Sequence, residues 1–280
     1  MKLIEIKAPA KINIGLDVLS KREDGYHNLN TLFYPIQDLF DTLLIERSEK
    51  YEFICDSSFV PTDASNLVVK AVSLLEKHSN KQIKARIELK KNIPSQAGLG
   101  GGSSDAAATL ISLNEMFQLE IKHERMLELA LELGSDVPFF IKAKPAIGTS
   151  RGEKLEFVNV EIVEPILIVN PRINVSTKEA FSNIVTNSSA TNFRSVISEE
   201  KLDYSLARVL IKNDFEPTVF GLHPEIGEIK KTLYECGALF ALMSGTGSTV
   251  YGIFPNTELA EKTKDKFPKS YFCFTSTPQT

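Results

Sequence analysis

Pro94-Ser-Gln-Ala-Gly-Leu-Gly-Gly-Gly-Ser-Ser-Asp105 is the stretch of sequence that decides the fold. It runs directly into Ala106-Ala-Ala-Thr-Leu-Ile111, and this alanine-rich composition predicts a helix from about residue 103 to residue 116. The glycines at 98, 100, 101 and 102 can adopt positive φ and leave their backbone N–H groups open to a ligand. The start of the helix adds unpaired N–H donors and the positive end of its dipole. The segment therefore predicts a cradle for a polyphosphate.

Two other glycine-rich motifs do not fit this segment. A dinucleotide-binding fingerprint would need a third glycine at position 103, where the chain has Ser103. A Walker A motif would need a lysine before the serine, and the loop contains none. A plain helix N-terminus on a flexible turn remains the simpler alternative. Glycine at four of five successive positions would be entropically costly for such a turn.

Length and charge narrow the function classes. With 280 residues, 42% of them hydrophobic, the chain can fill the cores of one large or two ordinary domains, and we expect two. A net charge of −4 gives no general attraction to nucleic acid or to an anionic membrane, so a local pocket must hold any anionic ligand. Cys55, Cys236 and Cys273 lack zinc or disulfide spacing, which suits reduced thiols. The N-terminus has no apolar signal-peptide core, so we expect a cytoplasmic protein.

The first half of the chain predicts strands followed by helices. Alternating polar and apolar residues predict half-buried strands at 3–7 and 12–19, with Ile12 and Ile14 on one face and Asn13 and Asp17 on the other. Further strands are expected at 31–36, 42–46, 51–55 and 83–89. Apolar stripes predict helices at 65–77, capped by Ser65 or Asn66, and at 123–133, ending at Gly134. Residues 136–141 are expected to pack as a turn.

The second half alternates helices with strands. A strand at 166–169 is expected to open the second domain, and the polar stretch 183–198 predicts an exposed connection of low order. Helices at 202–213, 224–236 and 257–266 alternate with strands at 238–243, 248–254 and 270–275. The pattern predicts an α+β protein with an N-terminal domain over 1–160 and a C-terminal domain over 161–280.

Two N-terminal segments carry polar residues that folding alone does not require. Lys11 lies in an otherwise apolar strand, where an edge-strand lysine that discourages aggregation is the simpler alternative. The segment Asp24-Gly25-Tyr26-His27 is typical of a hairpin turn, which is the simpler alternative here. An aromatic residue followed by histidine can also stack on a ring and hydrogen-bond to it.

Two later segments have the same character. Asp136 precedes Val137-Pro-Phe-Phe140, where it is either a helix N-cap or a functional carboxylate in apolar surroundings. Ser244-Gly-Thr-Gly-Ser-Thr249 separates two apolar strands and is longer and richer in hydroxyls than a tight hairpin needs. We expect this second loop to line a ligand.

Three of these segments resemble the motifs of one superfamily. Pro9-Ala-Lys-Ile-Asn13, Pro94 to Asp105 and Ser244-Gly-Thr-Gly247 are similar to the motifs of the galactokinase, homoserine kinase, mevalonate kinase and phosphomevalonate kinase (GHMP) superfamily. The segments 24–27 and 134–140 narrow the resemblance to the kinases that act on 4-diphosphocytidyl-2-C-methyl-D-erythritol in the non-mevalonate (methylerythritol phosphate) isoprenoid pathway. The resemblance covers nearly the whole chain and is weakest from about 183 to 220.

The resemblance implies a fold, substrates and site residues. The N-terminal domain should resemble ribosomal protein S5 domain 2 and the C-terminal domain a ferredoxin, with the active site in the cleft between them. ATP with Mg²⁺ would phosphorylate the C2 hydroxyl of the small-molecule substrate, and no protein partner is expected. The implied catalytic residues are Lys11 and Asp136, and no metal ligand is identified. The implied ATP-binding residues are Asn66, Pro94, Ser95, Gln96, Ala97, Gly98, Leu99, Gly100, Gly101, Gly102, Ser103 and Ser104. The implied residues for the cytidine diphosphate substrate are Asn13, Tyr26, His27, Thr177, Phe181, Gly245 and Thr246.

The resemblance also gives these residues roles. Asp136 would be the catalytic base and Lys11 its charged partner. Tyr26 and Phe181 would sandwich the cytosine. Gln96 departs from the small residue that many relatives have in the loop.

Two alternatives remain open. A sister kinase for mevalonate, homoserine or a sugar would share the glycine loop without needing Tyr26 and His27. A nucleotide-binding module without activity would not need Lys11 and Asp136 together.

Overall fold

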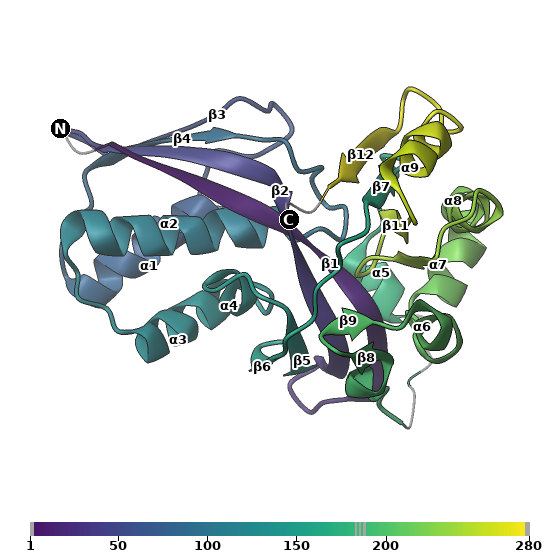
Figure 1. Cartoon of the computed structure of the whole chain (residues 1–280). Helices are drawn as coiled ribbons and strands as arrows, with labels where there is room; N and C mark the ends of the chain where they lie inside the picture. The colour runs from purple at the N-terminus through teal and green to yellow at the C-terminus, as the bar shows by residue number, and fades with distance from the viewer. Residues whose placement is uncertain (1–2, 183, 185, 187–188, 278–280) are drawn as a thin grey trace. The chain divides into compact units, whose positions relative to one another are not determined.

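A computed structural model describes residues 3–182, 184, 186 and 189–277 (Figure 1). The chain forms two compact units that interleave along the sequence. The first contains the residues up to Ala10, Leu39–Ser95 and Gly100–Lys144, and the second contains Lys11–Asp38, Gln96–Leu99 and the chain from Pro145 onward. Each unit contains both helices and strands, so the predicted mixture of α and β structure is confirmed.

Strands and helices build the described part of the first unit. Its strand pairs involve β2 (His27–Arg47), β3 (Glu52–Cys55) and β4 (Ala85–Lys90). The part of β2 from Thr42 to Arg47 runs antiparallel to β4, and β3 runs parallel to β4. The helices are α1 (Leu67–Ser79), α2 (Gly101–Phe117), α3 (His123–Leu133) and the short α4 (Val137–Phe140). Figure 1 shows α1 and α2 side by side, and they contact each other.

Local sequence explains the helix bounds of this unit. On α1, Val68, Ala71, Val72 and Leu75 are buried at helical spacing. The bounds of α3 are those predicted, and Gly134 is its C-cap. Helix α2 begins at Gly101, two residues before the predicted start. The turn expected at 136–141 contains the short helix α4.

In the described part of the second unit, four strands form an antiparallel sheet. Its order is β10 (Phe240–Met243), β11 (Val250–Ile253), β7 (Ile166–Asn170) and β12 (Phe272–Ser276). Helices α8 (Pro224–Glu235) and α9 (Thr257–Lys264) pack on this sheet. The predicted stripe of α8 is confirmed, because Ile226, Ile229 and Leu233 are buried in the core.

Two shorter groups of strands complete this unit. The part of β2 from Leu29 to Phe33 pairs with β5 (Ala146–Ser150), which pairs with β6 (Lys154–Phe157). Strands β8 (Ile197–Ser198) and β9 (Lys201–Leu202) pair with each other. The remaining helices are α5 (Thr177–Ser182), the 3-10 helix Phe193–Val196, α6 (Tyr204–Leu210) and α7 (Glu216–Leu222).

Several predicted elements were wrong. The strands expected at 3–7 and 12–19 are one strand, β1 (Leu3–Lys21), in which both Ile12 and Asn13 are buried. The strands expected at 31–36 and 42–46 are both parts of β2. The helix expected at 202–213 ends at Leu210, because the chain turns at 211–215 before α7 begins. Strands β5 and β6 and helices α5 and α7 were not predicted.

The connection predicted at 183–198 is only partly an exposed one. Residues 183, 185, 187 and 188 lie outside the described residues. Phe193 and Val196 are buried, because the 3-10 helix that they bound packs its apolar side chains inward. No helix within the described ranges is long and apolar enough to cross a membrane.

Candidate active site

Lys11 is buried on β1 and is held in place by its neighbours. Its side chain is 3% exposed, and its Nζ donates to Asn13 Oδ1 at 2.6 Å. The ammonium also lies 5.6 Å from the centre of the Phe33 ring. Asn13 Nδ2 donates in turn to Thr31 Oγ1 at 2.8 Å. The alternative of an exposed edge-strand lysine is therefore wrong, since a charge is buried in proteins only when partners compensate for the lost water.

The glycine loop is joined to β1 and to the second loop by hydrogen bonds. The backbone N–H of Lys11 donates to the carbonyl of Leu99 at 2.9 Å. Ser244 Oγ donates to the carbonyl of Gly98 at 2.8 Å and accepts from the N–H of Asn13 at 3.2 Å. Within this unit, residues from all three sequence motifs therefore lie together.

Gly98 cannot be replaced at this junction without movement of the chain. Its φ is +76°, and a Cβ built on it would lie 2.1 Å from the carbonyl oxygen of Ser244. Both the conformation and the close approach require glycine. The same is true of Gly245, whose φ is +59° and whose Cβ would lie 3.3 Å from the Cα of Gly98.

Helix α2 begins inside the glycine-rich segment. Gly100 is its N-cap with φ of 73° and provides no side-chain cap for the first turn. The first N–H groups of a helix have no partner inside the helix, and they carry part of the positive dipole charge. This geometry is suited to an anion, and the role of residues 94–104 in holding ATP phosphates stays a prediction.

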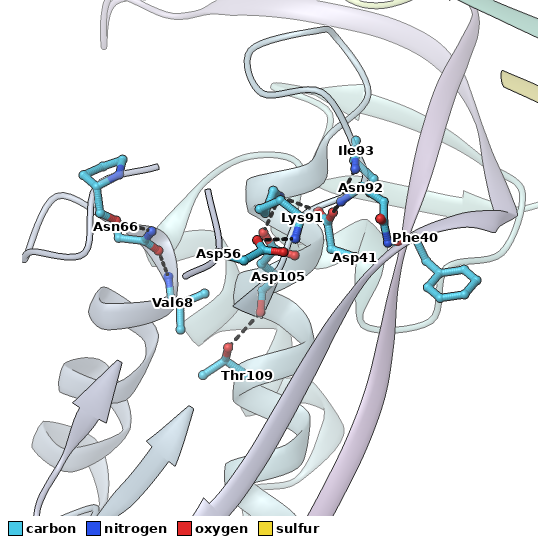
Figure 2. Close-up of polar contacts among 11 residues, drawn as sticks. Phe40, Asp41, Asp56, Asn66, Val68, Lys91, Asn92, Ile93, Asp105 and Thr109 are labelled. Carbon is cyan, nitrogen blue, oxygen red and sulfur yellow. Dashed lines mark hydrogen bonds and ion pairs between the residues drawn. The ribbon is translucent and has the colours of Figure 1, made fainter. Parts of the chain in front are cut away.

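A buried ion cluster lies beside the start of α2 (Figure 2). Lys91 Nζ forms ion pairs with Asp41 and, at 2.8 Å, with Asp105 Oδ2. The backbone N–H groups of Asn92 and Ile93 donate to Asp41 Oδ1 at 2.6 and 2.8 Å. Sequence reasoning missed this cluster, because its bonded pairs lie 14 to 52 positions apart and form no motif.

Burial controls the charges of this cluster. Burial raises the pKa of Asp105 to about 7, against the opposing attraction of Lys91, and the nearby Asp41 carboxylate adds to the rise. For Lys91, burial lowers the pKa, but the attraction of Asp105 and Asp41 outweighs it, so the net shift is upward. Lys91 is therefore charged at neutral pH, whereas Asp105 is poised to gain or lose a proton there.

Asn66 has a structural function at the start of α1. Its Oδ1 accepts from the N–H of Val68 at 2.8 Å (Figure 2). Its Nδ2 donates to the carbonyl of Pro61 at 2.7 Å. The cap is therefore Asn66, one of the two predicted residues, and not Ser65. Its predicted place near the adenine remains untested.

Asp136 occupies the N-cap position of the short helix α4. The residue is half-buried, and its side chain makes no capping hydrogen bond to this helix. The side chain therefore does not cap α4, and its catalytic role stays a prediction.

His27 and Phe181 are brought together in the second unit. Their rings stack with centroids 5.0 Å apart and planes 25° apart, and Phe181 also meets Phe215 edge-on at 4.8 Å. The ring of Tyr26, which is 52% exposed, instead lies 4.5 Å from the guanidinium of Arg151. Burial and then Lys21 lower the pKa of His27, so its imidazole is neutral at pH 7 and can both donate and accept.

The second loop is fixed by a residue that sequence reasoning missed. Asn213 is buried, and its Nδ2 donates to the carbonyls of Met243 and Gly245, both at 2.8 Å. At the next residue of the loop, the hydroxyls of Thr246 and Thr177 lie 3.4 Å apart. The structure therefore brings together Thr177 and Thr246, which the resemblance implied for the same substrate.

Asp17 is a second buried polar residue outside the predicted site. It is fully buried, and Oδ2 accepts from Asn30 Nδ2 at 2.8 Å and from the N–H of Thr191 at 2.7 Å. The sequence feature that could have revealed this residue is an aspartate within an otherwise apolar strand. Its partners show that it fixes the segment around Thr191.

Comparison with known proteins identifies the class. Residues 66–144 match the family described as "GHMP kinases N terminal domain", and residues 197–272 match "GHMP kinases C terminal". A crystal structure of homoserine kinase from Cytophaga hutchinsonii has the same fold, with a TM-score of 0.77 at 22% identity over 99% of this chain and 95% of that chain. The fold is that of a two-domain GHMP kinase.

More similar relatives define the branch. The 4-diphosphocytidyl-2-C-methyl-D-erythritol kinase of Azobacteroides pseudotrichonymphae is 43% identical over 88% of this chain and 91% of its own. That of Citrifermentans bemidjiense is 37% identical over 100% of both. A crystal structure of 4-(cytidine 5'-diphospho)-2C-methyl-D-erythritol kinase matches with a TM-score of 0.82 at 32% identity, over 97% of this chain and 98% of that chain. The chain belongs to the 4-diphosphocytidyl-2-C-methyl-D-erythritol kinase family.

Proposed function

We propose that the chain transfers the γ-phosphoryl group of ATP to the C2 hydroxyl of 4-diphosphocytidyl-2-C-methyl-D-erythritol, in isoprenoid precursor biosynthesis by the non-mevalonate pathway. The observation that carries this proposal is the buried network around Lys11, in which Asn13, Leu99 and Ser244 join all three kinase motifs. The relatives that bear this activity in their names support the choice of substrate.

The proposed reaction needs one proton acceptor. The substrate hydroxyl oxygen forms a bond to the γ-phosphorus, the bond from that phosphorus to the β-bridging oxygen breaks, and ADP leaves. Asp136 accepts the hydroxyl proton, and Lys11 stabilises charge on the transferred group. Phosphoryl transfer depends mainly on position and electrostatics, and the buried, hydrogen-bonded Lys11 is well suited to supply both.

ATP is proposed to bind at the start of α2 and along residues 94–104, with Asn66 near the adenine. The uncapped first turn and the positive φ of Gly98 and Gly100 support this placement. Mg²⁺ would arrive on the ATP phosphates and neutralise part of their charge, and we assign no side chain to it. Among the described residues no group of three or more His, Cys, Asp or Glu side chains is arranged as a metal site.

The cytidine diphosphate end of the substrate is proposed to bind near His27 and Phe181. A neutral imidazole beside an aromatic ring can pair with the edge of a base while the ring stacks on its face. Asn13, Tyr26, Thr177, Gly245 and Thr246 complete the proposed substrate-binding residues.

The finer architecture is also part of the proposal. We assign ATP binding and catalysis to a domain over residues 1–160 that resembles ribosomal protein S5 domain 2. We further propose that a ferredoxin-like domain over 161–280 lies on the substrate side and completes the substrate site begun by Asn13, Tyr26 and His27. The active site would lie in the cleft between them. The antiparallel order β10-β11-β7-β12 with helices packed on the sheet supports the ferredoxin-like assignment. We further propose a cytoplasmic enzyme that acts on small molecules without a nucleic acid, membrane or obligate protein partner.

The deciding experiment is an assay of ADP release with purified protein. ATP consumption should require 4-diphosphocytidyl-2-C-methyl-D-erythritol and give a product phosphorylated at C2 by mass spectrometry and ³¹P NMR. Mevalonate, homoserine and galactose should not replace it. Turnover of one of these instead would identify a sister kinase, and ATP binding without turnover of any would indicate a module without activity.

A further inference from the structure

The cluster of Asp41, Lys91 and Asp105 lies directly beside the first turn of α2. A Cβ built on Gly101, the first residue of this helix, would lie 3.3 Å from Lys91 Nζ and 3.1 Å from Ile93 Cγ2. Figure 2 shows Lys91 with Asp41 on one side and Asp105 of α2 on the other. The ammonium therefore lies within one helical turn of the N–H groups that would hold the ATP phosphates.

The cluster also fixes the segment that leads into the glycine loop. Asp41 is fully buried on β2, and it accepts from the backbone N–H groups of Asn92 and Ile93 as well as from Lys91. Through Lys91 and Asp105, this strand and the 91–93 segment are joined to α2. Three separate pieces of chain are thus held by one ammonium and two carboxylates.

The two carboxylates of the cluster differ in how well their charge is compensated. Asp41 accepts hydrogen bonds from three donors. Asp105 Oδ2 accepts from Lys91, whereas Asp105 Oδ1 is buried with no hydrogen-bond partner among the described residues. The buried Asp105 carboxylate therefore has few donors to compensate its charge, and burial raises its pKa.

The other titratable groups near Asp105 do not change this assignment. Lys91 and Asp41 face it directly, and Cys55 and Asp56 interact with the cluster from the adjoining end of β3. Asp56 is exposed and accepts from the backbone N–H of Lys91, not from its ammonium.

We propose that Asp41, Lys91 and Asp105 are positioning residues for ATP, which hold the first turn of α2 in one geometry and set the electrostatic charge beside the nucleotide phosphates. This inference rests on the proposed function, because it takes α2 as the ATP-binding helix. With a proton on Asp105 the cluster is neutral, and without it the cluster carries one negative charge. The raised pKa of Asp105 places this change near pH 7. Loss of the proton should weaken ATP binding, because the added negative charge repels the phosphates.

The test compares Asp105→Asn with Asp56→Asn. Both changes replace one carboxylate by its neutral isostere next to Lys91, but only the first lies in the buried cluster. Binding of a non-hydrolysable ATP analogue would be measured by calorimetric titration at pH 6 and pH 8. When the pH is raised from 6 to 8, the affinity of wild type and of Asp56→Asn for the analogue should fall about three- to tenfold more than that of Asp105→Asn. The reason is that the cluster stays neutral in Asp105→Asn. The phosphates of the analogue also change their protonation between these pH values, but this affects the affinity of all three proteins equally and cancels in the comparison.

Equal pH dependence in Asp105→Asn and wild type would overturn the electrostatic part of the inference. A second variant, Lys91→Arg, tests whether the cluster positions the first turn of α2 for ATP. It also keeps the inference testable if Asp105→Asn does not fold. Its larger planar group should weaken analogue binding at both pH values while affinity for cytidine diphosphate stays unchanged. Unchanged analogue binding, or an equal loss for both nucleotides, would overturn positioning. Failure of wild type to bind the analogue at all would instead contradict the proposed function.

Discussion

Buried charged and polar side chains mark the residues that this chain uses for more than folding. Lys11, Asp17, Asp41 and Asp105 are all at most 3% exposed, and each has hydrogen-bond or ion-pair partners. Taking such groups out of water is costly, and each is retained here only because its partners compensate for the lost water. Their presence therefore points to positioning and chemistry.

At this scale the base-binding proposal can be tested through His27. His27→Ala removes the ring that stacks on Phe181 and leaves the edge of a bound cytosine without its partner. Binding of cytidine diphosphate should weaken by about 1–3 kcal/mol, while affinity for the ATP analogue stays constant. Calorimetric titration measures both. His78→Ala, at the exposed end of α1, is the control and should bind like wild type.

A nucleotide comparison completes this test. Uridine diphosphate exchanges a donor for an acceptor at the ring edge and should bind wild type poorly. Equal binding of the two nucleotides, or an unaffected His27→Ala variant, would contradict a cytosine site.

Asp105 also predicts how stability depends on pH. Its raised pKa means that the folded chain binds more protons than the unfolded chain between the ordinary aspartate pKa of 3.8 and about 7. The stabilisation is present at acid pH and is lost as the pH rises through the folded pKa. Between pH 5 and pH 8 wild type should lose about 2–3 kcal/mol more unfolding free energy than Asp105→Asn. Urea unfolding of both proteins at pH 5 and pH 8 measures this difference. Equal losses of unfolding free energy in wild type and Asp105→Asn would show that Asp105 does not titrate in this range.

The sequence predicts the helices and strands that are determined by neighbouring residues, and it does not predict features that depend on residues far away in the chain. Helices α1, α3 and α8 follow from apolar stripes together with their caps and an initial proline, and their starts agree with the prediction to within two residues. Strand β1 was expected to be half-buried, yet Asn13 and Asp17 are buried as well. Their partners include Thr31 and Thr191, which the pattern of a single strand cannot reveal.

The residues of the candidate site likewise fall into those that the sequence predicts and those that it does not. The glycine loop, Lys11 and the second loop carry short motifs, so they could be found from sequence. The contacts of Asn213 with residues 243 and 245 join distant parts of the chain, as do those of Lys91 with Asp41. Only the fold brings such pairs together, and no spacing rule in the sequence anticipates them.

The junction of the glycine loop with the second loop gives a prediction for these elements. Gly98→Ala would force a Cβ against the carbonyl of Ser244 at a positive φ, and should destabilise the protein by about 2 kcal/mol or more. Gly102→Ala is the matched control, because its Cβ would come no closer than 3.9 Å to Leu67 Cδ1. Urea unfolding compares them, and equal stability of the two variants would refute the tight junction.

For the whole molecule, the main question is whether Lys11 and Asp136 serve one reaction, since they belong to different compact units. Asp136→Asn should lower kcat by about two or more powers of ten while ATP binding persists. Lys11→Met should do similar damage, and the double variant should be little worse than either single one. Steady-state kinetics of all four proteins measure this, with Lys154→Met on exposed β6 as a lysine control. Multiplicative losses would mean that the two residues act independently.

The interleaving of the two units has a consequence for synthesis on the ribosome. The first unit has all of its chain once residue 144 has emerged. The stretch of β1 around Leu16 is made far earlier than its partners, because its backbone bonds to Lys212 and Asp214. At a translation rate of about 5–20 residues per second, this stretch waits on the order of 10–40 s for them. During that time its apolar side chains are exposed, so the nascent chain should depend on protection by chaperones until nearly the whole protein has been made.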